Sequence, residues 1–252
     1  SYKLSNNFVL IKNKNLNFVF FNISYYLLLT PILLLLLFFQ IEIFYIRYFV
    51  YVLILFQIIF LFNKKNLNLK SFSYFYKLEY LVISFFLLFT ISQVTDADSL
   101  DYHLGSVMEI IRSERLQIRS DDWFHFRLIG FGEMINFYGL LFSSKNFGQL
   151  FQILSFSNLI ILFKKINKNS KLNYVIILSF PIFASLMLSA KQLLIVSNCY
   201  LLFLAFFLIN QKLEIKTIII ILILIISPIG FKHSYIIYSL PLWIFLFLKS
   251  YK

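Results

Sequence analysis

Long apolar runs alternate with short polar segments along the chain, and this alternation predicts membrane-spanning helices. A helix needs about 20 apolar residues to cross the hydrocarbon core of a bilayer. Eight runs approach that length, at 18–39, 43–62, 79–94, 147–163, 173–189, 192–209, 217–231 and 234–248. The first run is too long for the core of a signal peptide and has no small-residue cleavage site, so we expect it to be retained. The predicted fold class is therefore an all-α polytopic transmembrane protein with about eight spans.

Lysines gather in the polar segments on one side of these predicted spans. If the N-terminus is inside, 15 of the 18 lysines fall in the five inside segments. Cytoplasmic loops of membrane proteins carry such an excess of lysine and arginine. We therefore expect a cytoplasmic N-terminus and an extracytoplasmic segment at 95–146.

Residues 95–146 form the one long polar segment, and two parts of it predict helices. Residues 103–116 repeat apolar side chains at helical spacing along one face. Residues 128–142 are apolar but contain three glycines and Glu133, and counting them as a ninth span would move the lysines after residue 163 outside. We therefore expect two interfacial amphipathic helices in this loop. The chain then divides into spans 1–3 (residues 1–94), the loop (95–146) and spans 4–8 (147–252).

Composition supports lipid as the surroundings of the chain. Hydrophobic residues make up 60% of it and charged residues 13%, with a mean hydropathy of +0.83, whereas soluble domains are about 45–50% apolar. The net charge of +12 can indicate nucleic acid, but the lysines lie in short clusters between apolar runs. That arrangement indicates contact with lipid headgroups, and we expect no nucleic-acid partner. The chain starts with Ser1 rather than Met, so we expect a fragment.

The loop at 95–146 concentrates the polar chemistry of the chain. Eight of the 11 acidic residues, four of the five arginines and two of the three histidines lie in it. A carboxylate there can take a proton from a hydroxyl, hold a divalent cation, or mark a solvated loop. Asp96, Asp98 and Asp101 lie within six residues of one another. Their spacing favours the first two roles, and a divalent cation, if one binds, would use Asp96 and Asp98.

Short motifs in this region resemble a known family. The stretch D-S-L-D-Y-H-L, which begins at Asp98, resembles a signature of bacterial GT-C class glycosyltransferases, integral membrane enzymes related to protein mannosyltransferases. The stretch R-L-I-G-F-G-E-M-I-N-F, from Arg127, is similar to the second loop element of that class, with Glu133 at its acidic position. The stretches around Lys191 and Lys232 resemble its outer helix ends. The resemblance covers roughly residues 79–248 and implies that Asp98 is the catalytic base.

The resemblance implies an inverting transfer of a sugar from a polyprenyl-phosphate donor to a hydroxyl of a glycan, lipid or protein acceptor. A carboxylate takes the proton of that hydroxyl, the oxygen attacks the anomeric carbon, and the lipid phosphate leaves. Fixed cations stabilise the leaving phosphate. The candidate catalytic residues are Asp98, Asp101, Asp96 and His103. The candidate substrate-binding residues are Tyr102, Asp121, Asp122, Arg127, Glu133, Lys191, Lys232 and His233.

Other interpretations stay open at this stage. Lys191 and Lys232 can be headgroup anchors, and Asp121 and Asp122 can belong to a plain turn. A polyprenyl-linked glycan polymerase or ligase is disfavoured by the short later outer loops. A flippase-like transporter is disfavoured because the spans hold almost no ionisable residues. A non-catalytic membrane scaffold, or a truncated enzyme, is the remaining alternative.

Overall fold

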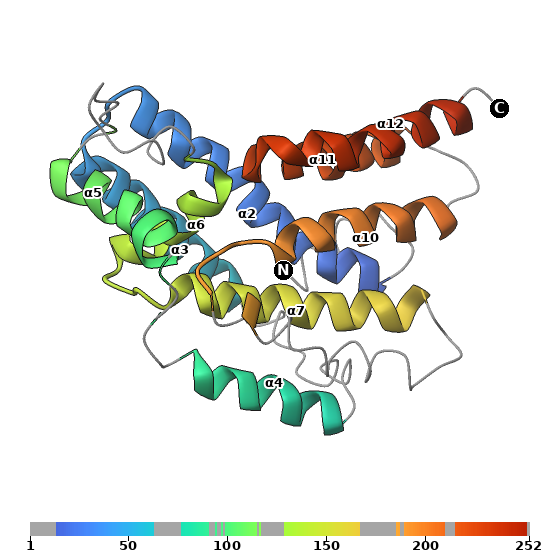
Figure 1. Ribbon diagram of the computed structural model, residues 1–252, viewed down its shortest axis with the longest axis horizontal. Helices are drawn as coiled ribbons and strands as arrows, with labels where there is room; N and C mark the ends of the chain where they lie inside the picture. Colours follow the sequence, from blue (N-terminus) through green and yellow to red (C-terminus); the bar gives the residue numbers. More distant parts are fainter. Residues whose placement is uncertain are drawn as a thin grey trace.

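The computed structural model describes residues 14–62, 77–90, 94, 97, 99–114, 116, 129–166, 185–186, 189–209 and 215–250. Within these residues the protein contains nine α-helices and no strand. The predicted all-α fold class is therefore confirmed for the described part of the chain. The long helices lie side by side along the molecule (Figure 1).

Seven of the α-helices coincide with predicted apolar runs. They are α2 (Lys14–Phe38), α3 (Ile43–Phe62), α4 (Lys77–Phe89), α7 (Phe147–Ile166), α10 (Leu194–Ile209), α11 (Ile215–Phe231) and α12 (Ile236–Ser250). The predicted run at 173–189 lies almost entirely outside the described residues. In α2 and α7, the stretches Phe18–Phe38 and Phe147–Lys164 are long and apolar enough to cross a membrane, and the apolar parts of the other helices are shorter.

Large apolar side chains cover the outer surface of several helices as well as the interior of the bundle. The outward faces of α3, α4 and α12 carry large apolar side chains, among them Phe56 (71% exposed) and Leu81 (66% exposed). Polar side chains such as Glu79, Gln152 and Asn198 are buried instead. Soluble monomers rarely expose contiguous apolar patches of more than a few hundred Å². This outer surface therefore suits contact with lipid.

Helix α2 occupies the centre of the bundle. Its N-terminal half packs against α7 and α10 in one apolar cluster that includes Val19, Ile23 and Phe206. Its C-terminal half packs against the loop helices in a second cluster that includes Leu33 and Phe137. One central helix therefore contacts both the long apolar helices and the loop that carries the candidate chemistry.

The two predicted loop helices are present, and only the first has the predicted one-sided face. A π-helix, η2 (Ser99–Leu104), leads into α5 (Gly105–Ser113), which buries Val107 and Ile110 and exposes Glu109. Helix α6 (Phe131–Leu141) buries nine of its eleven residues. Its glycines allow this close packing: a Cβ on Gly139 would lie only 2.2 Å from the Cβ of Phe147. The predicted single apolar face is therefore wrong for α6, which is enclosed by α2, α5 and α7.

The directions of the helices gather the loop segments at one end of the bundle. Helices α7, α10 and α12 begin at this end, at the left of Figure 1, and α4 and α11 finish there. Helices α5 and α6 lie at the same end. Polar residues around positions 100, 130, 190 and 232 are therefore close together in space although they are far apart in the sequence.

Candidate functional site

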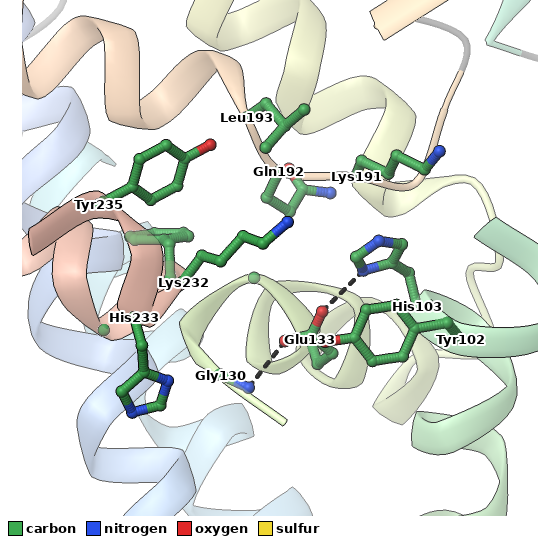
Figure 2. Close-up of a pocket in the computed structure, with 13 residues that line it drawn as sticks. Tyr102, His103, Gly130, Glu133, Lys191, Gln192, Leu193, Lys232, His233 and Tyr235 are labelled. Atoms are coloured by element: carbon green, nitrogen blue, oxygen red, sulfur yellow. Dashed lines mark hydrogen bonds and ion pairs between the residues drawn. The ribbon is translucent and has the colours of Figure 1, made fainter. Parts of the chain in front are cut away.

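A pocket of about 420 Å³ lies at this end of the bundle (Figure 2). Its size falls in the range of small-molecule sites, about 300–1,000 Å³. It is lined by Tyr102, His103, Gly130, Gly132, Glu133, Lys191, Gln192, Leu193, Gly230, Phe231, Lys232, His233 and Tyr235. Six candidate residues from four segments of the sequence therefore meet in one cavity: Tyr102, His103, Glu133, Lys191, Lys232 and His233.

Glu133 is held by hydrogen bonds to both of its carboxylate oxygens. Its Oε2 accepts a hydrogen bond from the backbone N–H of Gly130 at 2.7 Å, which caps the start of α6. Its Oε1 lies 2.7 Å from Nδ1 of His103. The Glu133 side chain is 3% exposed and that of His103 is 16% exposed. Glu133 therefore does not face water, and it joins the start of α6 to η2.

Asn136, one turn further along α6, fixes the backbone on two sides of the pocket. Its Nδ2 donates to the carbonyl oxygen of His103 at 3.2 Å and to that of Ala190 at 3.1 Å. Gln192 Nε2 donates in turn to Asn136 Oδ1 at 3.3 Å. The same face of α6 therefore holds the ring of His103 through Glu133 and its backbone through Asn136.

Amide side chains also fix the segment that presents Lys191. The side-chain amide of Gln152, on α7, donates to the carbonyl oxygen of Lys191. Its Oε1 accepts a hydrogen bond from the backbone N–H of Leu194 at 3.2 Å. Buried backbone groups outside regular helices need such partners, particularly where water is scarce. The irregular chain before α10 is therefore anchored to α7 beside the pocket.

Lysine side chains give the pocket an excess of positive charge. Lys232 follows the end of α11, and Figure 2 shows its side chain extending across the pocket toward Gln192 and His103. Among the described residues, no carboxylate lies within ion-pair distance of Lys232. Of the described residues, two lysines and one carboxylate line the cavity, and their charge favours an anionic ligand. His233 also lines it, but its ring points away from Glu133 and His103 (Figure 2).

Close approach of two glycines places Lys232 beside Glu133. A Cβ on Gly130 would lie 2.7 Å from the carbonyl oxygen of Gly230, and a Cβ on Gly230 would lie 2.2 Å from the ring of Phe131. Only glycine allows the start of α6 to abut the end of α11 in this way. The sequence offered a signal for these contacts, since both glycines interrupt apolar stretches.

Asp101 is the one candidate aspartate among the described residues, and it does not line the pocket. Asp101 lies on η2 and is exposed. Its neighbour Tyr102 stacks a tilted ring on His103, with ring centroids 4.3 Å apart. Five other candidates lie outside the described residues: Asp96, Asp98, Asp121, Asp122 and Arg127. The described part of the chain contains no cluster of three His, Cys, Asp or Glu side chains suited to a metal ion, so a cation at Asp96 and Asp98 stays a prediction.

Sequence reasoning missed three residues that shape the site: Asn136, Gln152 and Gln192. Each is an amide inside or beside an apolar run, which is unusual enough to have been a signal.

No curated protein and no solved structure matches the chain. Residues 4–250 match the family of the DUF1420 N-terminal domain. Because this match includes every residue that lines the pocket, and nearly the whole chain, the protein belongs to the DUF1420 N-terminal domain family.

Proposed function

We propose that this protein is a GT-C type membrane glycosyltransferase that moves a sugar from a polyprenyl-phosphate donor to an acceptor hydroxyl on the extracytoplasmic side. The observation that carries the proposal is the convergence of Tyr102, His103, Glu133, Lys191 and Lys232 on one cavity. These residues belong to separate stretches of the sequence. Their meeting is expected if those stretches build a single site.

The proposal includes about eight spans in a bacterial inner membrane, with the N-terminus in the cytoplasm. Its support is the lysine distribution, the apolar lengths of α2 and α7, and the apolar outer faces of α3, α4 and α12. With this orientation the described residues that line the pocket come from extracytoplasmic segments or from the adjoining ends of the spans. A lipid-linked donor would then reach the pocket with its tail still in the bilayer.

The proposed roles follow from the chemistry of the side chains. Lys191 and Lys232 bind the donor phosphate and stabilise the charge that grows on it as the bond to the sugar breaks. Asp98 takes the proton of the acceptor hydroxyl. Its neighbour Ser99 is fully buried and accepts a hydrogen bond from the backbone N–H of Ala190, the neighbour of Lys191, at 3.1 Å. This bond ties Ser99, the neighbour of Asp98 in the sequence, to the segment that presents Lys191.

Cysteine labelling tests the orientation. In a Cys199→Ala background, a membrane-impermeant thiol reagent added outside should modify a cysteine placed at Ser120 and leave one placed at Ser170 untouched. The reason is that the lysine asymmetry puts residue 120 outside and residue 170 inside. Labelling at 170 but not at 120 would reverse the topology and move the pocket to the cytoplasmic side.

A transfer assay tests the proposed activity. Protein reconstituted in liposomes should release polyprenyl phosphate from at least one member of a panel of polyprenyl-phosphate sugars when an acceptor is present. Lys232→Gln should lower kcat/KM for the donor roughly 10- to 100-fold, the effect expected when a hydrogen bond to a charged group is lost. Lys145→Gln is the matched control, since Lys145 is exposed in the turn between α6 and α7 and does not line the pocket. No transfer from any donor, or equal loss in both variants, would contradict the proposal.

A further inference from the structure

We infer that Glu133 is a positioning residue that fixes the tautomer of His103, so that Nε2 of the imidazole faces the pocket as a hydrogen-bond acceptor for a substrate hydroxyl. This deepens the proposed function and rests on it for the class of ligand, a sugar or another hydroxyl-bearing substrate. The geometry of the Glu133–His103 pair stands independently of that function.

Both oxygens of Glu133 face groups that can donate a hydrogen. Oε2 accepts from Gly130 and Oε1 faces Nδ1 of His103, each at 2.7 Å. An ionised carboxylate has no hydrogen to give, so the hydrogen of the second bond must sit on Nδ1. In the neutral imidazole the lone pair is then on Nε2. In Figure 2 the second ring nitrogen lies on the side of the ring away from Glu133, toward Gln192 and Lys191.

The contacts around His103 hold its ring in the orientation that keeps Nδ1 against Glu133. Its backbone carbonyl accepts from Asn136 and its ring lies against that of Tyr102. Glu133 is anchored at the start of a buried helix. The hydrogen bond made by one imidazole nitrogen decides which tautomer is present. The pair is therefore built to present a single tautomer to the cavity.

The chemistry of the pocket indicates a hydroxyl, rather than a phosphate, as the partner of His103. Lys191 and Lys232 offer only donors, which suits phosphate oxygens. An ionised phosphate oxygen offers only lone pairs and cannot donate to an unprotonated Nε2. A sugar hydroxyl can donate to His103 and accept from a lysine at the same time.

Glu133→Gln is the substitution that isolates the effect of Glu133 on the tautomer of His103. The N–H of Gly130 can only donate, so the new amide must turn its oxygen to Gly130 and its NH₂ group to His103. Nδ1 must then accept, and the hydrogen moves to Nε2. The variant keeps the size of the side chain and the cap of α6 while it converts the pocket-facing nitrogen from acceptor to donor.

Nitrogen-15 NMR of histidine-labelled protein in nanodiscs measures the tautomer directly. The chain has only 3 histidines, and the loss of one signal in His103→Asn assigns the resonance. At alkaline pH, wild-type His103 should carry its hydrogen on Nδ1, and Glu133→Gln should move it to Nε2. Glu109→Gln, on the exposed face of α5, is the matched control and should leave the tautomer unchanged. A wild-type spectrum with the hydrogen on Nε2 would overturn the inference without reliance on any variant.

The transfer assay tests the role of the acceptor nitrogen. Glu133→Gln should lower kcat/KM roughly 10- to 100-fold, since a hydroxyl of the substrate then meets a donor in place of an acceptor. Transfer at the wild-type rate despite a switched tautomer would overturn the inference and leave the proposed function standing. A wild-type protein with the hydrogen on Nδ1 that transfers no sugar would overturn the proposed function and the hydroxyl ligand, while Glu133 would keep its role in fixing His103.

Discussion

Asp98→Asn should lower the rate of sugar transfer by about 10²- to 10⁴-fold, the range expected when a general base is removed. Asparagine keeps the shape of the side chain and most of its hydrogen bonding, but it cannot take the proton of the acceptor hydroxyl. Binding of the donor should survive, because the proposed phosphate contacts are Lys191 and Lys232. Single-turnover transfer and a separate measurement of donor binding will distinguish these two effects.

The neighbouring aspartates provide the comparison for this result. If Asp98→Asn keeps near wild-type turnover while Asp96→Asn abolishes it, the role of the base moves to Asp96. The same reasoning applies to Asp101, although its exposed position on η2 makes it a poorer candidate. If all three substitutions leave transfer intact, the acidic cluster is not catalytic and the proposed glycosyltransferase loses its main chemical support.

The positions of the long helices were predictable because the length of an apolar run dominates the conformation of such segments. The run at 43–62 coincides with α3, and the run at 147–163 differs from α7 only at its end. The run at 79–94 was predicted too long, since α4 ends at Phe89. There the polar residues Thr90, Ser92 and Gln93 already indicated the end of the apolar stretch.

The surroundings of α6 could not be predicted from its own sequence. Leu, Ile and Phe on several faces fit an interfacial helix, a span or a buried helix equally well. What decides is contact with residues outside the helix, such as Phe147 against Gly139 and Ala190 against Asn136. Six of the twelve candidate residues were predictable as a group, because they flank apolar helices whose ends lie at one end of the bundle. Their pairing was not, and the bond from Glu133 to His103 was found only in the structure.

A second large effect should follow from removing the buried ion pair that anchors α4. Lys164 Nζ on α7 lies 2.7 Å from Glu79 Oε2 on α4, and the Glu79 side chain is fully buried. Lys164→Met should lower the free energy of unfolding by about 3–5 kcal/mol, because it removes the cation that lies 2.7 Å from a buried carboxylate oxygen. Unfolding in mixed detergent micelles, followed by loss of helical circular dichroism, measures this change.

Two control variants distinguish the loss of the ion pair from a general effect of substitution on stability. Lys145→Met removes an exposed lysine and should change stability by no more than about 0.5 kcal/mol. The double substitution Lys164→Met with Glu79→Leu should recover most of the lost stability, since an apolar pair of similar size has no buried charge to compensate.

The Lys164–Glu79 ion pair lies at the end of α4 opposite Thr90, whose carbonyl oxygen accepts a hydrogen bond from Asn146 at 2.7 Å. Because α4 leads directly into the segment with Asp98, Lys164→Met should also reduce the rate of sugar transfer. If the Lys164→Met variant is as stable as the wild type, apolar packing against α7 alone holds α4 in place.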